Sequence, residues 1–311
     1  MTLRIEHGDC RDVLATLPAQ SVQTCVTSPP YFGLRDYGVA GQIGLEPTPD
    51  AYVAELVAVF REVRRVLADD GTVFLNLGDS YAANRPYQVS QSKHKSLDYG
   101  TSNATVCPPG LKPKDLIGIP WRVAFALQAD GWYLRSDIIW HKPNPMPESV
   151  RDRPTKAHEY VFLLSKQERY FYDADGIREE ASSREHWERY GAASKGYLAK
   201  AKNIPGQSPH TNGAKMGIHQ NGRNARSVWT ITPKPFRGAH FATFPPALAE
   251  RCIKAGSRPG DTVLDPFAGA GTTLMVAAQL QRNAVGVELN PAYAAMAEAR
   301  IAEAVGMLEL A

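Results

Sequence analysis

Hydrophobic residues recur at two different spacings along this chain of 311 residues. Short continuous apolar runs, such as the one over 21–28, are typical of buried strands. Apolar residues at intervals of three and four over 48–71 instead predict an amphipathic helix that ends at Gly71. The two patterns alternate, which favours a mostly parallel sheet with helices on both faces. The predicted strands span 3–10, 21–28, 72–81, 133–144, 158–166, 261–271 (ending in a glycine turn) and 283–290, and the predicted helices span 10–18, 48–71, 119–132, 244–256, 272–282 and 291–306.

Two polar segments interrupt this alternation. Residues 82–114 contain turn residues and little periodicity, which predicts a long loop that is mobile when nothing is bound. Between Glu188 and Glu250 there is no acidic residue but there are nine Lys or Arg, interleaved with aromatic side chains and histidines. A solvated or disordered loop is one interpretation of such a run. We favour a segment that contacts phosphate groups, and we divide the chain into 1–180, an insertion at 181–226, and 227–311.

Composition indicates the cellular compartment of the protein but does not identify a binding partner. The net charge of +3 neither demands nor excludes a polyanion. The four cysteines are scattered, with no CxxC pair and no His/Cys cluster at zinc spacing, so we expect no disulfide framework and no metal site. The amino terminus lacks the features of a signal peptide, and no stretch approaches the roughly 20 apolar residues that cross a bilayer. We therefore expect a cytoplasmic protein with no membrane partner.

The segment DPFAGAGTT ends a predicted strand and opens a predicted helix, where backbone N–H groups can hold a ligand. Gly269 and Gly271 permit a tight turn, but Leu274 stands where a dinucleotide-binding fingerprint has its third glycine, so a pyrophosphate ligand is disfavoured. Asp265 suits a ligand with an ammonium group, and Glu288 at the end of the next strand can accept hydrogen bonds from a ribose. These features together predict S-adenosylmethionine, against the alternative of a purely structural turn.

The segment TSPPY also follows a predicted strand, and its two prolines stiffen the loop. In a parallel sheet both segments lie at the carboxyl ends of strands, so they are expected to face one another across a cleft. The Ser28 hydroxyl and the Pro29 carbonyl could accept the two N–H hydrogens of an aromatic amino group and aim its lone pair at a methyl donor. Tyr31 offers a face on which a base swung out of a duplex can stack.

TSPPY followed much later by DPFAGAGTT and GVELN resembles the DNA amino-methyltransferases of the β arrangement, in which the catalytic motif precedes the cofactor motif. The resemblance implies a Rossmann-like methyltransferase fold with permuted motif order, S-adenosylmethionine as cofactor, duplex DNA as substrate, and a target-recognition region at 181–226. It implies Ser28, Pro29, Pro30 and Tyr31 as catalytic residues. It implies cofactor contacts from Asp9 (in the GD of HGDC), Thr243, Phe244, Asp265, Phe267, Gly269, Gly271, Thr272 and Glu288.

Several alternatives remain open at this point. In the family, serine at the first position of the tetrad is associated mainly with the N4 amino group of cytosine and aspartate with N6 of adenine, so cytosine is expected first and adenine second. A methyltransferase of RNA or of a protein amide would share the tetrad but usually carries asparagine there, and a non-catalytic DNA-binding module would not need Glu288. A homodimer and a separately acting restriction endonuclease are further candidate partners.

Some single residues allow two interpretations. A strand end over 140–144 could line the base pocket or simply pack, and Asp79 could act in catalysis or cap a helix. His141 as a general base is disfavoured, because the amino nitrogen can release its proton to water. The residues of this strand end are Trp140, His141, Lys142 and Asn144.

Overall fold

The structure is a computed structural model that describes residues 1–82, 107, 110–180, 222–233 and 245–309. It divides into one unit formed by Met1–Tyr172 with Ser227–Ala311 and a second formed by Asp173–Arg226. Most of the predicted loop at 82–114, most of the predicted recognition segment at 181–226, and the cofactor candidates Thr243 and Phe244 lie outside the described residues. Their predicted roles stay predictions.

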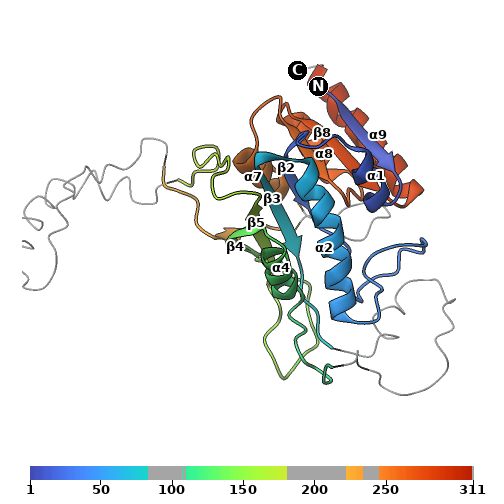
Figure 1. Cartoon of the computed structure of the whole chain (residues 1–311). Helices are drawn as coiled ribbons and strands as arrows, with labels where there is room; N and C mark the ends of the chain where they lie inside the picture. Colours follow the sequence, from blue (N-terminus) through green and yellow to red (C-terminus); the bar gives the residue numbers. More distant parts are fainter. Residues whose placement is uncertain (83–106, 108–109, 181–221, 234–244, 310–311) are drawn as a thin grey trace, which may run out of the picture. The chain divides into compact units, whose positions relative to one another are not determined.

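A single mixed sheet organises the described part of the first unit (Figure 1). Every pair of neighbouring strands is parallel except the two made by β5, which runs antiparallel to both β3 and β4. The prediction of a mostly parallel sheet is thus confirmed. The strand order is β1 (Leu3–His7), β8 (Asn283–Glu288), β7 (Thr262–Asp265), β2 (Val22–Thr27), β3 (Leu67–Leu77), β5 (His158–Ser165), β4 (Tyr133–His141) and β6 (Val228–Thr230).

The helices of this unit form two groups, one on each face of the sheet. In the first group α2 (Pro49–Val66) contacts both α1 (Cys10–Thr16) and α4 (Ile119–Ala129). In the second group, coloured orange to red in Figure 1, α8 (Thr272–Gln279) contacts both α7 (Pro246–Gly256) and α9 (Pro291–Glu309). Because side chains alternate across a strand, β3 packs Val73, Leu75 and Leu77 beneath α2 while Phe74 meets α7 on the other face.

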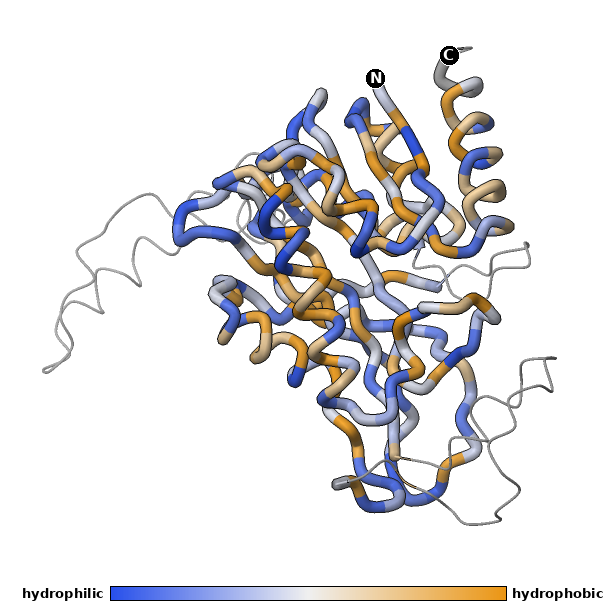
Figure 2. The backbone as a smooth tube through the Cα atoms, turned by 45° about the vertical axis from the view of Figure 1, so that its right-hand side comes forward, coloured by the Kyte–Doolittle hydropathy of each residue, from blue (hydrophilic) through white to orange (hydrophobic). Residues whose placement is uncertain are grey.

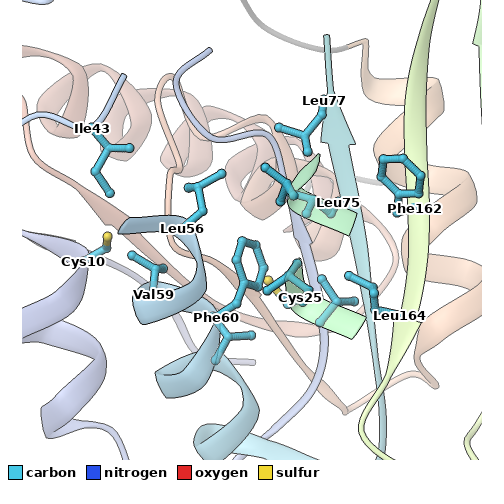
Figure 3. Close-up of a cluster of buried hydrophobic side chains, with 14 of the residues drawn as sticks. Cys10, Cys25, Ile43, Leu56, Val59, Phe60, Leu75, Leu77, Phe162 and Leu164 are labelled. Carbon is cyan, nitrogen blue, oxygen red and sulfur yellow. The ribbon is translucent and has the colours of Figure 1, made fainter. Parts of the chain in front are cut away.

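Helix α2 illustrates how the local sequence builds an element that the core then holds. Its N-cap is Thr48, whose hydroxyl accepts a hydrogen bond from the Ala51 N–H, and Pro49 occupies the first turn. An N-cap of this kind contributes about 1 kcal/mol. The buried positions of the helix recur every three or four residues, and Figure 3 shows Leu56 and Phe60 packed among strand side chains that include Cys25 and Leu75.

The helix predicted over 48–71 ends earlier than expected, at Val66, and β3 begins directly at Leu67. Gly71 lies inside β3 and is not the helix stop that its type suggested. A Cβ atom at Gly71 would stand 2.5 Å from Leu67 Cγ and 2.9 Å from the Gln23 carbonyl oxygen, next to a register shift between β2 and β3. The glycine therefore permits a close approach of two strands at a bulge.

Strand β6 was not predicted, because three residues are too few for a hydrophobic period to show. The closing helix predicted over 291–306 is present as α9, and Figure 2 shows hydrophobic and hydrophilic residues alternating along it. Among the residues that the structure describes, no helix combines the length and the apolar character that a membrane span requires.

The described ends of the second unit contain a small charged cluster. Glu179 pairs with Arg223 as an isolated β-bridge, and its carboxylate forms ion pairs with Arg223 at 3.3 Å and Arg226 at 2.9 Å. Two of the nine basic residues noted in the sequence thus have an acidic partner within this unit.

The contact of α7 with the sheet generates a stability prediction. A Cβ atom at Gly256 would stand 2.4 Å from Thr24 Oγ1 and 2.8 Å from Thr72 Oγ1, so Gly256→Ala should force the helix away from the sheet and cost about 1–3 kcal/mol. Gly306→Ala in α9 is the matched control, because a Cβ atom there meets nothing within 4 Å. Urea denaturation of both variants measures the difference, and equal free energies of unfolding would contradict this packing.

Candidate active site

The two sequence segments singled out above meet at one edge of the sheet. TSPPY follows β2 and DPFAGAG follows β7, and these strands are parallel neighbours with Cys25 opposite Leu264. A cavity of about 1040 Å³ opens at this edge and is lined by residues of both segments. The expected cleft between the two segments is therefore present in the structure.

A buried hydrogen-bond cluster, the Thr27–Asp265–Thr273 cluster, joins the two segments. The Thr27 hydroxyl donates to Asp265 Oδ1 at 2.6 Å, and the Thr273 hydroxyl donates to Asp265 Oδ2 at 2.7 Å. The Phe267 N–H also donates to Oδ1, at 3.1 Å. All three residues of the cluster are only 1% exposed. In so dry a site these bonds fix the end of β2 against the glycine turn.

The cluster qualifies the role predicted for Asp265. Its Oδ1 atom already accepts two hydrogen bonds and its Oδ2 atom accepts one, so at most one acceptor position remains for a ligand ammonium group. Burial raises the pKa of Asp265 to about 6, because the charged form loses its hydration, although the three donors lower it in part. Asp265 lines the cavity, and its contact with the cofactor stays a prediction.

Glu288 ends β8 and lines the same cavity. Its Oε2 atom accepts the Gly269 N–H at 2.8 Å and its Oε1 atom accepts the Asn290 N–H at 2.8 Å. Each carboxylate oxygen keeps a further lone pair, which is what two neighbouring ribose hydroxyls require. Burial raises the pKa of Glu288, while the backbone N–H bonds oppose that rise.

Pairing of β1 with β8 places Gly8 and Asp9 beside Glu288, since His7 is the residue opposite Glu288 and the Gly8 N–H donates to the Glu288 carbonyl at 3.0 Å. Both residues line the cavity. The Asp9 carboxylate, however, caps α1 by accepting the Arg11 N–H at 2.9 Å and pairs with the Arg11 guanidinium, which lowers the pKa of Asp9. In this structure the Asp9 side chain therefore acts as the N-cap of α1.

The residues of the glycine turn have two different positions: some line the cavity, and Gly271 packs against α9. Gly269, Phe267 and Thr272 line the cavity, and Gly269 has a φ of +52°, while their contact with the cofactor stays a prediction. Gly271 is the N-cap of α8, with a φ of +73°, and a Cβ atom there would stand 2.8 Å from Ala297 Cβ. Gly271 is therefore explained by the close packing of α8 on α9, and its contact with the cofactor stays a prediction.

Two tyrosines at this end of the cavity were missed by the sequence reasoning. Tyr37 and Tyr293 line the cavity and pack edge to face, with ring centroids 6.4 Å apart. They come from a loop after β2 and from the first turn of α9, so no spacing in the sequence connects them. Their rings give this end an aromatic wall next to Glu288.

The residues at this end fit S-adenosylmethionine. A carboxylate with free lone pairs suits a ribose, an aromatic wall suits an adenine ring, and the buried Asp265 has one acceptor position for an ammonium group. The cavity volume of about 1040 Å³ lies at the upper end of the range of small-molecule sites.

The other end of the cavity is built around the tetrad. Ser28, Pro29, Pro30 and Tyr31 all line it. The Pro30 carbonyl accepts a hydrogen bond from the Tyr52 hydroxyl at 2.9 Å, which anchors the loop to α2. The Tyr31 ring packs over Gly78, where a Cβ atom would stand 2.5 Å from Tyr31 Cε2. The tetrad is consequently held from two sides.

The structure separates the single residues that allowed two interpretations. Trp140, Lys142 and Asn144 line the cavity, whereas His141 contacts Thr230, with 3.2 Å between Nδ1 and Oγ1. Asp79 also lines the cavity, but its Oδ1 atom accepts the N–H groups of Gly118 and Ile119 at the start of α4, both at 3.0 Å. That contact is the helix cap that the sequence allowed.

Glu159 is the clearest functional candidate that the sequence reasoning missed. It lies in β5, lines the cavity, and pairs with Lys142 while the Tyr31 hydroxyl donates to it at 2.8 Å. Only the antiparallel direction of β5 brings this residue to the edge of the sheet where the parallel strands end.

Comparison with known proteins identifies the family. A family model described as DNA methylase matches residues 22–299. The chain belongs to the DNA methylase family. It is 48% identical over 299 residues to the Type II methyltransferase M.SmaI of Serratia marcescens, and the alignment covers 96% of this chain and 90% of that protein. It is 49% identical over 296 residues to M.XycI of Xanthomonas campestris pv. cyanopsidis, which covers 95% and 86%.

Solved structures agree with this assignment. TTHA0409 of Thermus thermophilus, crystallised with S-adenosyl-L-methionine, matches this DNA methylase with a TM-score of 0.60 and 27% identity over 98% of this chain and 95% of that one. The cytosine-N4-specific PvuII DNA methyltransferase shares the fold, with a TM-score of 0.63 and 19% identity over 99% and 93%. These matches confirm the predicted family and fold and agree with the predicted cofactor.

The burial of Asp265 generates a prediction about pH. A carboxyl group whose pKa is about 6 in the folded DNA methylase and 3.8 when unfolded holds its proton more tightly in the native state. Its contribution to stability is therefore full below about pH 4 and is lost as the pH rises to about 6, by up to about 3 kcal/mol. Asp265→Asn should flatten this slope.

Chemical denaturation between pH 4 and pH 8 measures the slope. Asp12→Asn, which removes an exposed carboxylate from α1, controls for the change in net charge. A slope unchanged by Asp265→Asn would show that this carboxylate is not desolvated.

Proposed function

We propose that this DNA methylase transfers a methyl group from S-adenosylmethionine to the N4 amino group of cytosine in duplex DNA, after the base has been swung out of the helix. The observation that carries the proposal is the Thr27–Asp265–Thr273 cluster, which holds the tetrad and the glycine turn on one cavity. The names of M.SmaI and M.XycI support a role as a Type II modification enzyme.

In this proposal the chain's own residues prepare the amino nitrogen. The Ser28 hydroxyl and the Pro29 carbonyl accept its two N–H groups, which draws the nitrogen toward tetrahedral geometry and frees its lone pair. The Tyr31 ring supports the base by stacking. S-adenosylmethionine, held along Glu288, Gly269 and Phe267, would supply the electrophilic methyl group through cleavage of its S–CH3 bond and would leave as S-adenosylhomocysteine. After it takes up that methyl group, the amino nitrogen releases one proton to water.

Ser28 favours cytosine, because serine at this position is associated mainly with cytosine in the family that the sequence resembles. Adenine N6 is the second candidate, since adenine presents a similar amino group beside a ring nitrogen. The segment at 181–226 is proposed to read the sequence of the target, supported by its run of basic residues without acidic ones after Glu188.

Nucleoside analysis of duplex DNA, incubated with the protein and labelled S-adenosylmethionine, tests the proposal. N4-methylcytosine is the expected product, and Ser28→Ala should lower turnover on the order of 10²-fold while cofactor affinity is kept. Ser21→Ala is the matched control, because Ser21 directly precedes β2 and its hydroxyl donates to the Pro18 carbonyl. N6-methyladenine would establish the alternative, and label found only in RNA or protein would overturn both.

Gly269→Asp tests the cofactor end by itself. The new residue would have to adopt a backbone φ of +52°, and its carboxylate would lie next to that of Glu288. Affinity for S-adenosylmethionine should therefore fall by at least about tenfold. Gly260→Asp, also at a positive φ of +87° but with nothing within 4 Å, controls for backbone strain. Calorimetry measures both affinities, and undiminished binding by Gly269→Asp would exclude this turn from the cofactor site.

A further inference from the structure

Glu159 reaches the tetrad because β5 runs against its neighbours. Its register pairs Tyr160 with Leu77 of β3 and Glu159 with Trp140 of β4. The beginning of β5 therefore lies at the edge of the sheet where β3 and β4 end. The Glu159 side chain is only 15% exposed there, so its charge needs partners within the protein.

The partners of Glu159 give it a defined charge and direction. Lys142 Nζ forms an ion pair with Oε1 and also lies 4.3 Å from the centre of the Trp140 ring. The Asn76 amide donates to Oε2 at 3.1 Å. An ionised carboxylate only accepts hydrogen bonds, so the Tyr31 hydroxyl at 2.8 Å from Oε2 must be the donor of that contact.

Tyr31 keeps the proton that it donates. Desolvation and the negative charge of Glu159 raise the pKa of Tyr31 well above its ordinary value. The Tyr31 hydroxyl also lies 3.4 Å from Asn76 Oδ1, but its contact with Glu159 is much shorter, at 2.8 Å. Its proton therefore goes to Glu159, and the oxygen of Tyr31 is left as an acceptor. The only neighbouring hydroxyl among its described contacts is that of Ser28, with 3.5 Å between the two oxygens.

The direction of this chain of hydrogen bonds decides what Ser28 can do. A hydroxyl has one hydrogen and two lone pairs, and Ser28 directs its hydrogen to Tyr31. Because Ser28 lines the cavity, its lone pairs are then available to an N–H donor that enters it. The 3.5 Å separation is long, and catalytic hydrogen bonds of this kind shorten when the substrate is bound.

We propose that Glu159 is a positioning residue that acts through the Tyr31 hydroxyl to fix the Ser28 hydroxyl as a hydrogen-bond acceptor for the target amino group. This inference rests on the proposed methyl transfer. In this arrangement Tyr31 has two roles. Its ring supports the base, and its hydroxyl donates to Glu159 while it accepts the hydrogen of the Ser28 hydroxyl.

Two variants break the chain at different points. Tyr31→Phe keeps the ring and removes the hydroxyl, and Glu159→Gln keeps the shape while replacing the ionised acceptor by an amide. Each should lower kcat on the order of 10²-fold, with KM for DNA and affinity for S-adenosylmethionine within about twofold of the parent. The double variant should be no slower than the slower single variant, because both changes interrupt one chain.

Tyr160→Phe is the matched control, since it removes a hydroxyl from the next residue of β5, whose ring stacks on Phe162. It should keep the parent's kcat. Full turnover in Glu159→Gln or in Tyr31→Phe would overturn the inference. So would additive losses in the double variant, or losses confined to stability and cofactor affinity, because these would mark Glu159 as a structural anchor only.

Failure of the inference differs visibly from failure of the proposed function. If the unaltered protein methylates DNA and Glu159→Gln does so at the same rate, only the inference is wrong. If the unaltered protein transfers no methyl group to DNA, the proposed function is wrong and the inference falls with it. Should Glu159→Gln fail to fold, Tyr31→Phe alone decides, since it leaves the Lys142 pair with Glu159 intact.

Discussion

Two threonine hydroxyls and one buried carboxylate connect parts of the chain that are 238 residues apart in sequence. The Thr27–Asp265–Thr273 cluster lies at the junction of β2 and β7, in the middle of the sheet, with almost no exposed surface through which water could replace its bonds. A hydrogen bond in such surroundings is strong and directional, and leaving a partner unmade is costly. The distance between the tetrad and the glycine turn is therefore fixed by the interior of the protein, beneath the cavity that both segments line.

The cavity is chemically divided along its length. Toward β8 and β1 it presents the Glu288 carboxylate, backbone N–H groups and tyrosine rings, which suit a ribose and a flat heterocycle. Toward β3, β5 and β4 it presents hydroxyls, amides and the Lys142–Glu159 pair, which suit a polar base edge. The buried carboxylate of Asp265 lies where the two regions adjoin. A methyl donor and an acceptor base can thus be held by different groups within one cavity.

The antiparallel strand β5 enlarges the set of residues that can take part. In a purely parallel sheet only strand ends and the loops after them reach the ligand edge. Reversing one strand brings its first residues to that edge as well, so the beginning of β5 supplies Glu159 directly opposite Trp140. The same reversal explains why Lys142, after the end of β4, meets an acidic partner 17 residues further along the chain.

The sequence by itself determined the elements whose chemistry is local. The alternating apolar periods specified the strands and helices, because burial and backbone geometry act over a few residues. The glycines and prolines of the two motifs constrain their own turns, and these motifs carried the resemblance to a methyltransferase family. It could not place the end of α2, where Gly71 serves a close approach of β3 to β2 and not a helix stop.

Nor could it assign Gly271 to the packing of α8 on Ala297, or bring Tyr37, Tyr293 and Glu159 to the cavity. These features depend on strand order and strand direction, which set distances between residues far apart in sequence. Only the tertiary structure decides them, because the hydrophobic pattern of a segment does not reveal which residues of other strands lie beside it.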